Sequence, residues 1–216
     1  MLTQQGPKNN GQCPLNIRPD GGLVDSSPYA RALSNPGGAA YVNGQGSIGG
    51  QAVNFTGTQY FQAPASADWS WGNGDWTIEA EYYHRANAAA GGALVALSYG
   101  SGANNWSLNA GDRYLSFMSY ASGATGLQNV SASASPFAAT TWLHLAAVMR
   151  SGVLTLFHHG VPVASGSITN GVGRSDSAIQ FGSDGVNNKI DGMIANLRIH
   201  RRAVYTRQFT PPTRQF

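Results

Sequence analysis

Two glutamates lie two positions apart in the stretch WTIEAEYYHR, and the 216-residue sequence contains no others. Alternate residues of a β-strand point to the same face, so Glu79 and Glu81 are expected ~6.5–7 Å apart. Retaining glycosidases place an acid and a nucleophile about 5–5.5 Å apart. The spacing therefore allows glycoside hydrolysis, but a catalytic pair also needs a supporting cleft. The sequence favours solvated glutamates on a sheet face, with a glycoside hydrolase as the weaker alternative.

Two loops carry the residue types that bind sugars, which are aromatic rings beside short amides. The first loop holds Trp69, Trp71 and Asn73, and the second holds Asn104, Asn105 and Trp106. An exposed tryptophan provides a stacking surface, whereas a buried one only fills the end of a core or a subunit contact. Both interpretations are open from the sequence, and the first predicts a glycan-binding site.

A third group of polar residues has the oxygen chemistry of a calcium site. Asp184, Asn187, Asn188 and Asp191 crowd the segment SDGVNNKID. Carboxylate and amide oxygens suit Ca²⁺, but aspartate and asparagine are also the common residues of turns. Calcium is therefore a possible ligand, and no other cofactor is expected. The five histidines lack the spacing of a zinc site, and His144 is expected to be packed in the core.

The composition limits the classes of function. The net charge of +3 is too small for a general nucleic-acid footprint, and no apolar run is long enough to span a membrane. With a single cysteine, Cys13, no internal disulfide can form, and the first residues lack the apolar region of a signal peptide. We therefore expect a protein made in the cytoplasm that binds neither nucleic acid nor membrane.

Short β-strands separated by glycine-rich turns must position these residues, because no stretch has a convincing helical period. Ser151-Gly152 and His159-Gly160 mark two hairpin turns. This pattern predicts an all-β fold, a two-sheet antiparallel jelly-roll sandwich. The expected strands are 14–18, 51–55, 59–63, 75–84, 92–99, 105–109, 113–120, 127–134, 142–150, 153–158, 161–165, 178–182 and 190–200.

Three segments, in order, resemble the concanavalin A-like lectin/glucanase superfamily, and most of all its laminin-G-like jelly-roll domains. They are QAVNFTGTQYFQAPASADWSWGNGDWTIEAEYY, TTWLHLAAVMRSGVLTLFHHGVPVASG and IQFGSDGVNNKIDGMIANLRIHRRAVYTRQFTPP. The resemblance covers roughly residues 14–212. Superfamily glucanases place further acids on the strand of Glu79 and Glu81, and Tyr83 stands where the next would fall. An acidic pair is usual in the last core strand of the family, and this chain has Ala195-Asn196 there.

The ending LRIHRRAVYTRQFTPPTRQF is similar to the close of laminin-G-like domains in bacteriophage virion proteins. That resemblance implies a non-enzymatic structural protein of a phage particle, located in the virion as a head (capsid) decoration or a tail-associated component. The implied partners are other virion proteins and further copies of the chain in an oligomer. A carbohydrate-binding lectin-like module, attached to host or environmental glycans, is the alternative and can coexist with the first.

Three parts of the chain are expected: an N-terminal arm 1–12, a jelly-roll domain 13–200 and a C-terminal arm 201–216. The C-terminal arm combines arginine forks with rigid aromatic rings, the residue types that are enriched in interfaces, and Pro211-Pro212 fix its course. It is therefore expected to contact symmetry mates or another virion protein through Arg201, Arg202, Tyr205, Arg207, Phe209 and Phe216.

Overall fold

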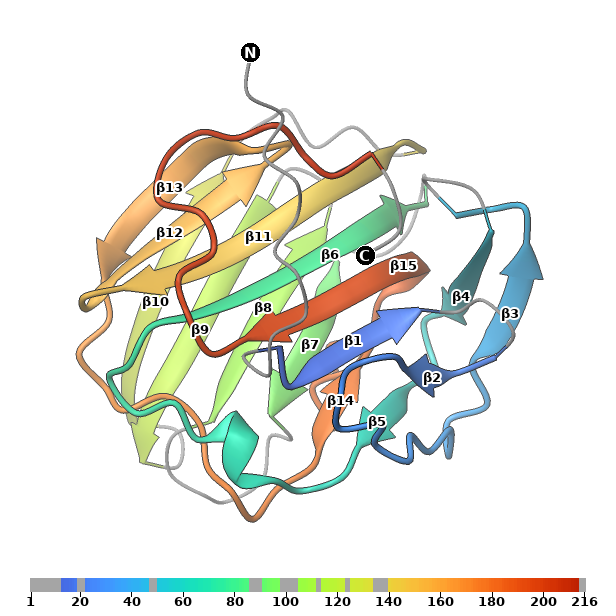
Figure 1. Ribbon diagram of the computed structural model, residues 1–216, viewed down its shortest axis with the longest axis horizontal. Helices are drawn as coiled ribbons and strands as arrows, with labels where there is room; N and C mark the ends of the chain where they lie inside the picture. The colour runs from blue at the N-terminus through green and yellow to red at the C-terminus, as the bar shows by residue number, and fades with distance from the viewer. Residues whose placement is uncertain are drawn as a thin grey trace.

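The protein is an all-β sandwich of two antiparallel sheets (Figure 1). The computed structural model describes residues 13–18, 22–46, 50–85, 91–97, 105–111, 114–122, 125–133 and 140–213. Within these ranges, the 3-10 helix η1 (Ala67–Trp69) is the only helical element. The predicted arm 1–12 lies outside the described residues. No helix in the described part of the chain is both long and apolar enough to cross a membrane.

Sheet A places strands side by side that are far apart in the sequence, as a jelly roll does. Its central strand β6 (Trp76–His84) lies between β11 and β15. The order of the sheet is β13 (Val161–Ser167), β12 (Val153–His158), β11 (Trp142–Arg150), β6, β15 (Asp191–His200), β1 (Leu15–Arg18) and β2 (Val24–Asp25). Beside this path, β4 (Gln51–Thr56) pairs with β15 and with β3 (Ala40–Asn43).

Sheet B forms the second layer, behind sheet A in the view of Figure 1. Its order is β10 (Thr125–Ser133), β9 (Tyr114–Ser122), β8 (Trp106–Gly111), β7 (Gly92–Leu97), β14 (Ile179–Phe181) and β5 (Phe61–Ala63).

The main core lies between the sheets because alternate side chains of each strand point inward. On β6 these are Trp76, Ile78, Ala80 and Tyr82, the face that the sequence pattern predicts. Trp76 lies 4.9 Å from the ring of Phe117 on β9, which joins the two layers by aromatic contact. Large rings of this kind each bury 150–250 Å², so they contribute much of the apolar burial.

The strand predictions are confirmed for all thirteen expected segments, with ends that differ by a few residues. Both predicted hairpin turns are also present, and Ser151, Gly152, His159 and Gly160 all have positive φ, as a type I′ turn requires. The sequence missed β2 and β3. β2 has only two residues, and β3 is mostly exposed, so neither shows a clear apolar alternation.

The segment that follows β15, residues 201–213, crosses the outer face of sheet A, and we call it the strap (Figure 1). Its Tyr205 and Phe209 pack on Ala146 and Val148 of β11 and on Phe157 of β12. This second apolar layer buries part of the outer face of β11, a strand that is buried on both faces.

Candidate functional site

The tryptophans predicted to form a sugar platform lie in the core. The exposed fractions of Trp69, Trp71 and Trp106 are 0%, 7% and 1%. Trp71 is wedged between Trp76 and Trp106, with ring centroids at 4.9 and 4.8 Å, so it fills the space between the sheets. The prediction of an exposed stacking platform made of these three rings is therefore wrong. Each ring buries more apolar surface in the core than it would in an exposed loop. Asn73 is exposed in its loop, and Asn104 lies outside the described residues.

Glu79 and Glu81 are buried, which corrects the expectation of solvated side chains. They do share the outer face of β6, where Tyr205 of the strap lies against Glu79. Glu79 Oε1 lies 2.7 Å from Arg198 Nη2 and 3.3 Å from His200 Nε2, both on β15. Burial alone would raise the pKa of Glu79, but Arg198 and the hydrogen bonds from the two histidines hold that pKa well below its ordinary value.

The second oxygen of Glu79 is held by β11 and by the strap. His144 Nε2 lies 3.2 Å from Oε2, and the Tyr205 hydroxyl donates to the same oxygen at 2.7 Å. Burial and the Glu79 charge raise the pKa of Tyr205, so its hydroxyl stays protonated and acts as a donor. The expected core position of His144 is confirmed. Glu79 is therefore enclosed by four partners and serves as a buried ionic centre under the strap.

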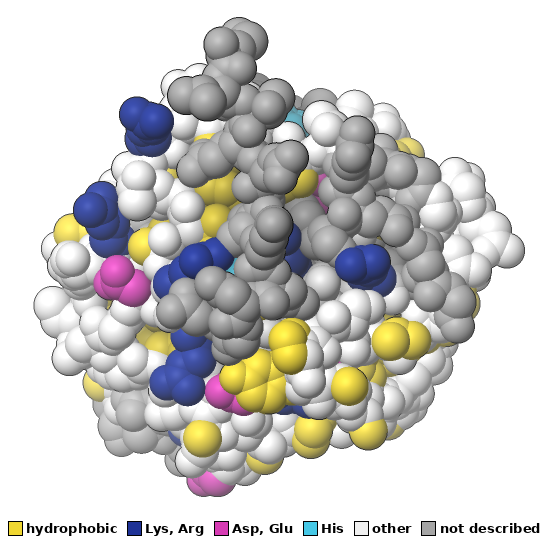
Figure 2. Space-filling model, in the orientation of Figure 1, with side chains coloured by type: hydrophobic (Ala, Val, Ile, Leu, Met, Phe, Trp, Pro, Cys, Tyr) yellow, Lys and Arg dark blue, Asp and Glu magenta, His cyan; other side chains and the backbone are white. Residues whose placement is uncertain are grey.

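Tyr205 and Phe209 of the C-terminal arm pack on their own domain, and contact of this arm with another molecule stays a prediction. Tyr205 stacks on Phe209 at 3.5 Å with 4° between the ring planes, and Phe209 lies 5.3 Å from Phe157. The backbone of Arg202 is also attached to the domain, because its carbonyl accepts a hydrogen bond from Thr77 Oγ1 on β6. Arg201 and Arg207 are exposed, and Figure 2 shows arginine and lysine side chains across this face. Phe216 lies outside the described residues.

The expected calcium ligands are engaged in protein contacts. Asp184 Oδ1 accepts hydrogen bonds from the backbone nitrogens of Val186, Asn187 and Asn188, which is the turn interpretation. Asp191 pairs instead with Arg85. In the part of the chain that the structure describes, no three His, Cys, Asp or Glu side chains gather closely enough to hold a metal ion. Calcium binding through this set stays a prediction of the sequence.

Two of the predicted groups meet at one place. Asn105 and Trp106, from the predicted sugar site, line a cavity of about 170 Å³ together with Asp184 and Asn188, from the predicted calcium site. This cavity belongs to the outer side of sheet B.

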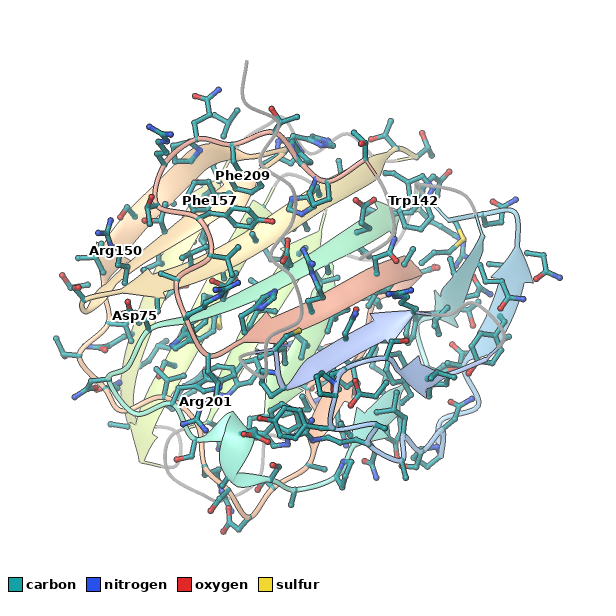
Figure 3. The ribbon with its side chains drawn as sticks, in the orientation of Figure 1. Asp75, Trp142, Arg150, Phe157, Arg201 and Phe209 are labelled. Carbon is teal, nitrogen blue, oxygen red and sulfur yellow. The ribbon has the colours of Figure 1, made fainter. Side chains whose placement is uncertain are left out.

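A larger groove, of about 800 Å³, lies on the outer face of sheet A. Its floor is a row of paired residues that crosses neighbouring strands: Asn54 on β4 faces Met193 on β15, and Met193 faces Tyr83 on β6. Trp142 on β11 continues the row, with its ring 5.6 Å from that of Tyr83. Figure 3 shows Trp142 on the β4 side of this face and Phe157 and Phe209 on the strap side. The groove and the strap therefore share one sheet face.

Polar and aromatic side chains from β3 form the outer wall of the groove. Val42 packs on Met193 and Ala195 of the floor. Tyr41 and Asn43, at the alternate positions of this strand, line the edge of the groove, and Tyr41 is 37% exposed. The remaining lining residues are Val42, Gln45, Asn54, Tyr83, Arg85, Thr140 and Met193.

Arg85 is fixed at the base of the groove. Its guanidinium donates to the carbonyl of Phe55 at 2.6 Å and to the side-chain oxygen of Asn54. It also pairs with Asp191, so its charge is compensated. The groove consequently combines an aromatic wall and several amides with little net charge.

The family model of the concanavalin A-like lectin/glucanases superfamily matches residues 55–208 of the chain. The chain belongs to this superfamily. No curated protein sequence matches the chain at a significant level.

Solved structures similar to this member of the superfamily include a domain of an enzyme and binding domains of toxins. Domain 4 of the extracellular GH43 arabinanase AbnA from Geobacillus stearothermophilus, in complex with arabinotriose, has a TM-score of 0.69 at 16% identity. The match covers 90% of this chain and 94% of that domain.

Two toxin domains are similar over the same part of the chain. The binding domain of Paraclostridial Mosquitocidal Protein 1 has a TM-score of 0.70 at 15% identity, with 91% of this chain and 50% of that one covered. The binding domain of botulinum neurotoxin DC in complex with SialylT has a TM-score of 0.66 at 15% identity, and the match covers 90% of this chain and 48% of that one. This chain therefore spans about half the length of these toxin domains. At these identities the likeness shows the fold.

The superfamily match begins at residue 55, so β3 and most of β4 precede it. These strands supply Tyr41, Asn43 and Asn54 to the groove. Sequence reasoning named none of them as site residues, and it placed Tyr83 only on the face of Glu79. A usable signal was present, because Tyr41 and Asn43 alternate in AYVN as an aromatic-amide pair on one strand face.

Proposed function

We propose that the chain is a carbohydrate-binding module that holds a neutral glycan in the groove of sheet A, without cleaving it. The observation that carries the proposal is the lining of the groove, in which the tyrosines Tyr41 and Tyr83 accompany the amides of Asn43 and Asn54. A sugar ring presents apolar C–H faces and a rim of hydroxyl groups. It therefore stacks on an aromatic face and exchanges hydrogen bonds with amides.

The size and charge of the groove support this ligand class. A volume of about 800 Å³ lies in the ordinary range of ligand sites, ~300–1,000 Å³, and suits an oligosaccharide. Arg85 is the cation of the lining, and Asp191 compensates it. A neutral glycan consequently loses no charge interaction with water on entering the groove.

The comparisons support the proposal at the level of the fold. The arabinanase domain matches over nearly its full length and is described in complex with arabinotriose. Because fold alone does not determine function, the groove residues of this chain carry the argument.

Binding without catalysis is supported by the surroundings of Glu79. Its carboxylate is fully buried and contacts Arg198, His144, His200 and Tyr205, which leaves no space for a sugar at its oxygens. Incubation with oligosaccharides should release no new reducing ends. Release by the wild-type chain, with loss in Glu79→Gln, would contradict this part of the proposal.

A glycan array followed by calorimetry with the best neutral oligosaccharide tests the binding site. Tyr41→Ala removes the stacking ring and should weaken the affinity roughly tenfold, since an aromatic contact contributes ~0.5–1.5 kcal/mol. Tyr41→Phe keeps the ring and should bind nearly as well as the wild type.

Tyr29→Ala is the matched control, because Tyr29 is another exposed tyrosine, 46% accessible, that does not line the groove. It should leave the affinity unchanged. Wild-type affinity in Tyr41→Ala, or the absence of any bound glycan on the array, would overturn the proposal.

The expected place in a bacteriophage particle, as a head decoration or tail-associated component that is oligomeric, stays a prediction from the sequence ending. Mass spectrometry of purified particles would test it.

A further inference from the structure

Asn54 lies in the groove of sheet A beside an arginine that determines how its amide is turned. It pairs with Met193 of β15, and both residues line the groove. Arg85 Nη2 donates a hydrogen bond to Asn54 Oδ1. A guanidinium group donates hydrogen bonds and accepts none, so the amide atom that faces Arg85 must be the oxygen. The orientation of this amide is therefore fixed by the chemistry of its neighbour.

The other end of the Asn54 amide carries two N–H donors. The side chain is half-buried, and none of the described residues accepts a hydrogen bond from Nδ2. Arg85 is itself held in place, because Nη1 donates to the Phe55 carbonyl at 2.6 Å and also pairs with Asp191. These contacts to β4 and β15 keep the oxygen of Asn54 occupied, so the groove that Asn54 lines receives the donor end.

The surface next to Asn54 is apolar. Met193, directly opposite it, packs with Ala52 of β4 and Val42 of β3, and Met193 and Val42 line the groove. A ligand group at this position meets N–H donors on one side and apolar side chains on the other. A hydroxyl group that accepts from the amide brings a proton of its own, for which the apolar side chains provide no acceptor. An acetamido group instead brings a carbonyl oxygen for the donor and a methyl group for the apolar surface.

We infer that the groove selects glycans that carry acetamido groups, with Asn54 as the specificity-determining residue and Arg85 as its positioning residue. The acetamido oxygen accepts a hydrogen bond from Asn54 Nδ2, and the methyl group packs on Met193. Asp191 compensates the charge of Arg85, so the neutral acetamido group is favoured over a carboxylate. This inference rests on the proposed carbohydrate-binding function and names the class of sugar that the groove takes.

Pairs of neutral glycans that differ only in acetamido or hydroxyl groups test the inference. The first pair is the N-acetylglucosamine trimer of chitin and the glucose trimer of cellulose, which share one linkage, and a glycan array extends the comparison to other linkages. Calorimetry with the full chain should give a roughly tenfold higher affinity for the acetamido member, the effect of about one hydrogen bond.

Asn54→Asp tests the donor directly. The aspartate keeps an oxygen for Arg85 but puts a second oxygen where the N–H donors were, so the preference for the acetamido member should disappear. Asn73→Asp is the matched control, because it makes the same substitution at an exposed loop residue that does not line the groove. It should keep the wild-type preference.

Two variants of Arg85 separate positioning from a merely structural role. Arg85→Gln offers an amide that can also accept, so Asn54 is free to turn its oxygen toward the groove, and the preference should fall. Arg85→Lys keeps a group that only donates and should retain the preference, although both variants lose the fork of the arginine. A structural role would weaken both members of a pair alike and leave the ratio of their affinities unchanged.

The outcomes distinguish this inference from the proposed function. Equal affinities for the two members of each pair in the wild type would overturn the acetamido preference and leave carbohydrate binding in place. An undiminished preference in Asn54→Asp would likewise overturn the role of Asn54. Binding to neither member of any pair would overturn the proposed function together with the inference.

Discussion

Glu79 shows how one buried charge ties three neighbouring strands and the strap together. Arg198 and His200 reach it from β15, His144 from β11 and Tyr205 from the strap. A buried carboxylate needs such partners, because an unpaired charge in the interior is very costly. The same partners that stabilise its charge therefore hold the C-terminal segment against the sheet.

Glu79→Gln should destabilise the protein by about 3–5 kcal/mol, because it leaves the charge of Arg198 buried without its counter-ion. Urea unfolding measures the loss. Asp176→Asn is the control: Asp176 also pairs with an arginine, Arg174, but at the surface, so the free energy of unfolding should hardly change.

The same variant has a predictable pH dependence. The pKa of Glu79 is held well below the ordinary 4.5, so the unfolded chain binds its proton first as the pH falls. Its contribution to stability is complete above about pH 4.5 and is lost toward the depressed folded pKa. Below pH 4.5 the wild type should therefore lose stability more steeply than Glu79→Gln. Parallel slopes of the two proteins would contradict the ionic interpretation of this centre.

At this scale the sequence could predict on which face of a strand a side chain lies, but it could not predict which residues bury that face. Alternation placed Glu79, Glu81 and Tyr83 together on one face of their strand, which the structure confirms. The cover of Glu79 includes Tyr205, a residue more than a hundred positions away. The same limit applies to Trp71, whose loop position gave no sign that its ring enters the core.

At the scale of elements, the strands and hairpins followed from local patterns, whereas the docking of the strap did not. The strap attaches where the β12–β13 turn meets Phe209: the Phe209 nitrogen donates to the Gly160 carbonyl at 3.0 Å. A Cβ on Gly160 would lie 1.9 Å from the Phe209 carbonyl oxygen. This glycine is therefore needed both for its turn, at φ +77°, and for the close approach of the strap.

Gly160→Ala should release the strap, and Gly152→Ala provides a matched control. Gly152 has φ +80° in the preceding turn, and a Cβ there would meet nothing within 4 Å. Both variants carry the strain of a left-handed alanine, but only Gly160→Ala collides with Phe209. Limited trypsin digestion should cleave after Arg207 faster in Gly160→Ala, with the Gly152→Ala rate near that of the wild type. Equal rates in the two variants would show that the strap does not depend on this contact.

At the scale of the whole molecule, the groove lies toward β3 and β4 on the outer face of sheet A, and the strap lies toward β11 and β12 on the same face. The groove of one chain is expected to hold one glycan, and binding at this single site is expected to be weak. In the oligomer that the sequence ending predicts, several grooves together would strengthen attachment to a surface dense in glycans.

Mixtures with a long neutral polysaccharide should therefore become turbid, because an oligomer with one groove per copy joins separate polymers. Short oligosaccharides should not produce this effect, because each is too short to be bridged into a network. Tyr41→Ala should greatly reduce the turbidity, since it weakens the groove in every copy, while Tyr29→Ala should retain it. Light scattering across a protein titration measures the effect, which should rise and then fall once excess protein saturates the polymer. Mixtures that stay clear at every ratio would show that each particle in solution carries a single groove, and the expected oligomer would then be wrong.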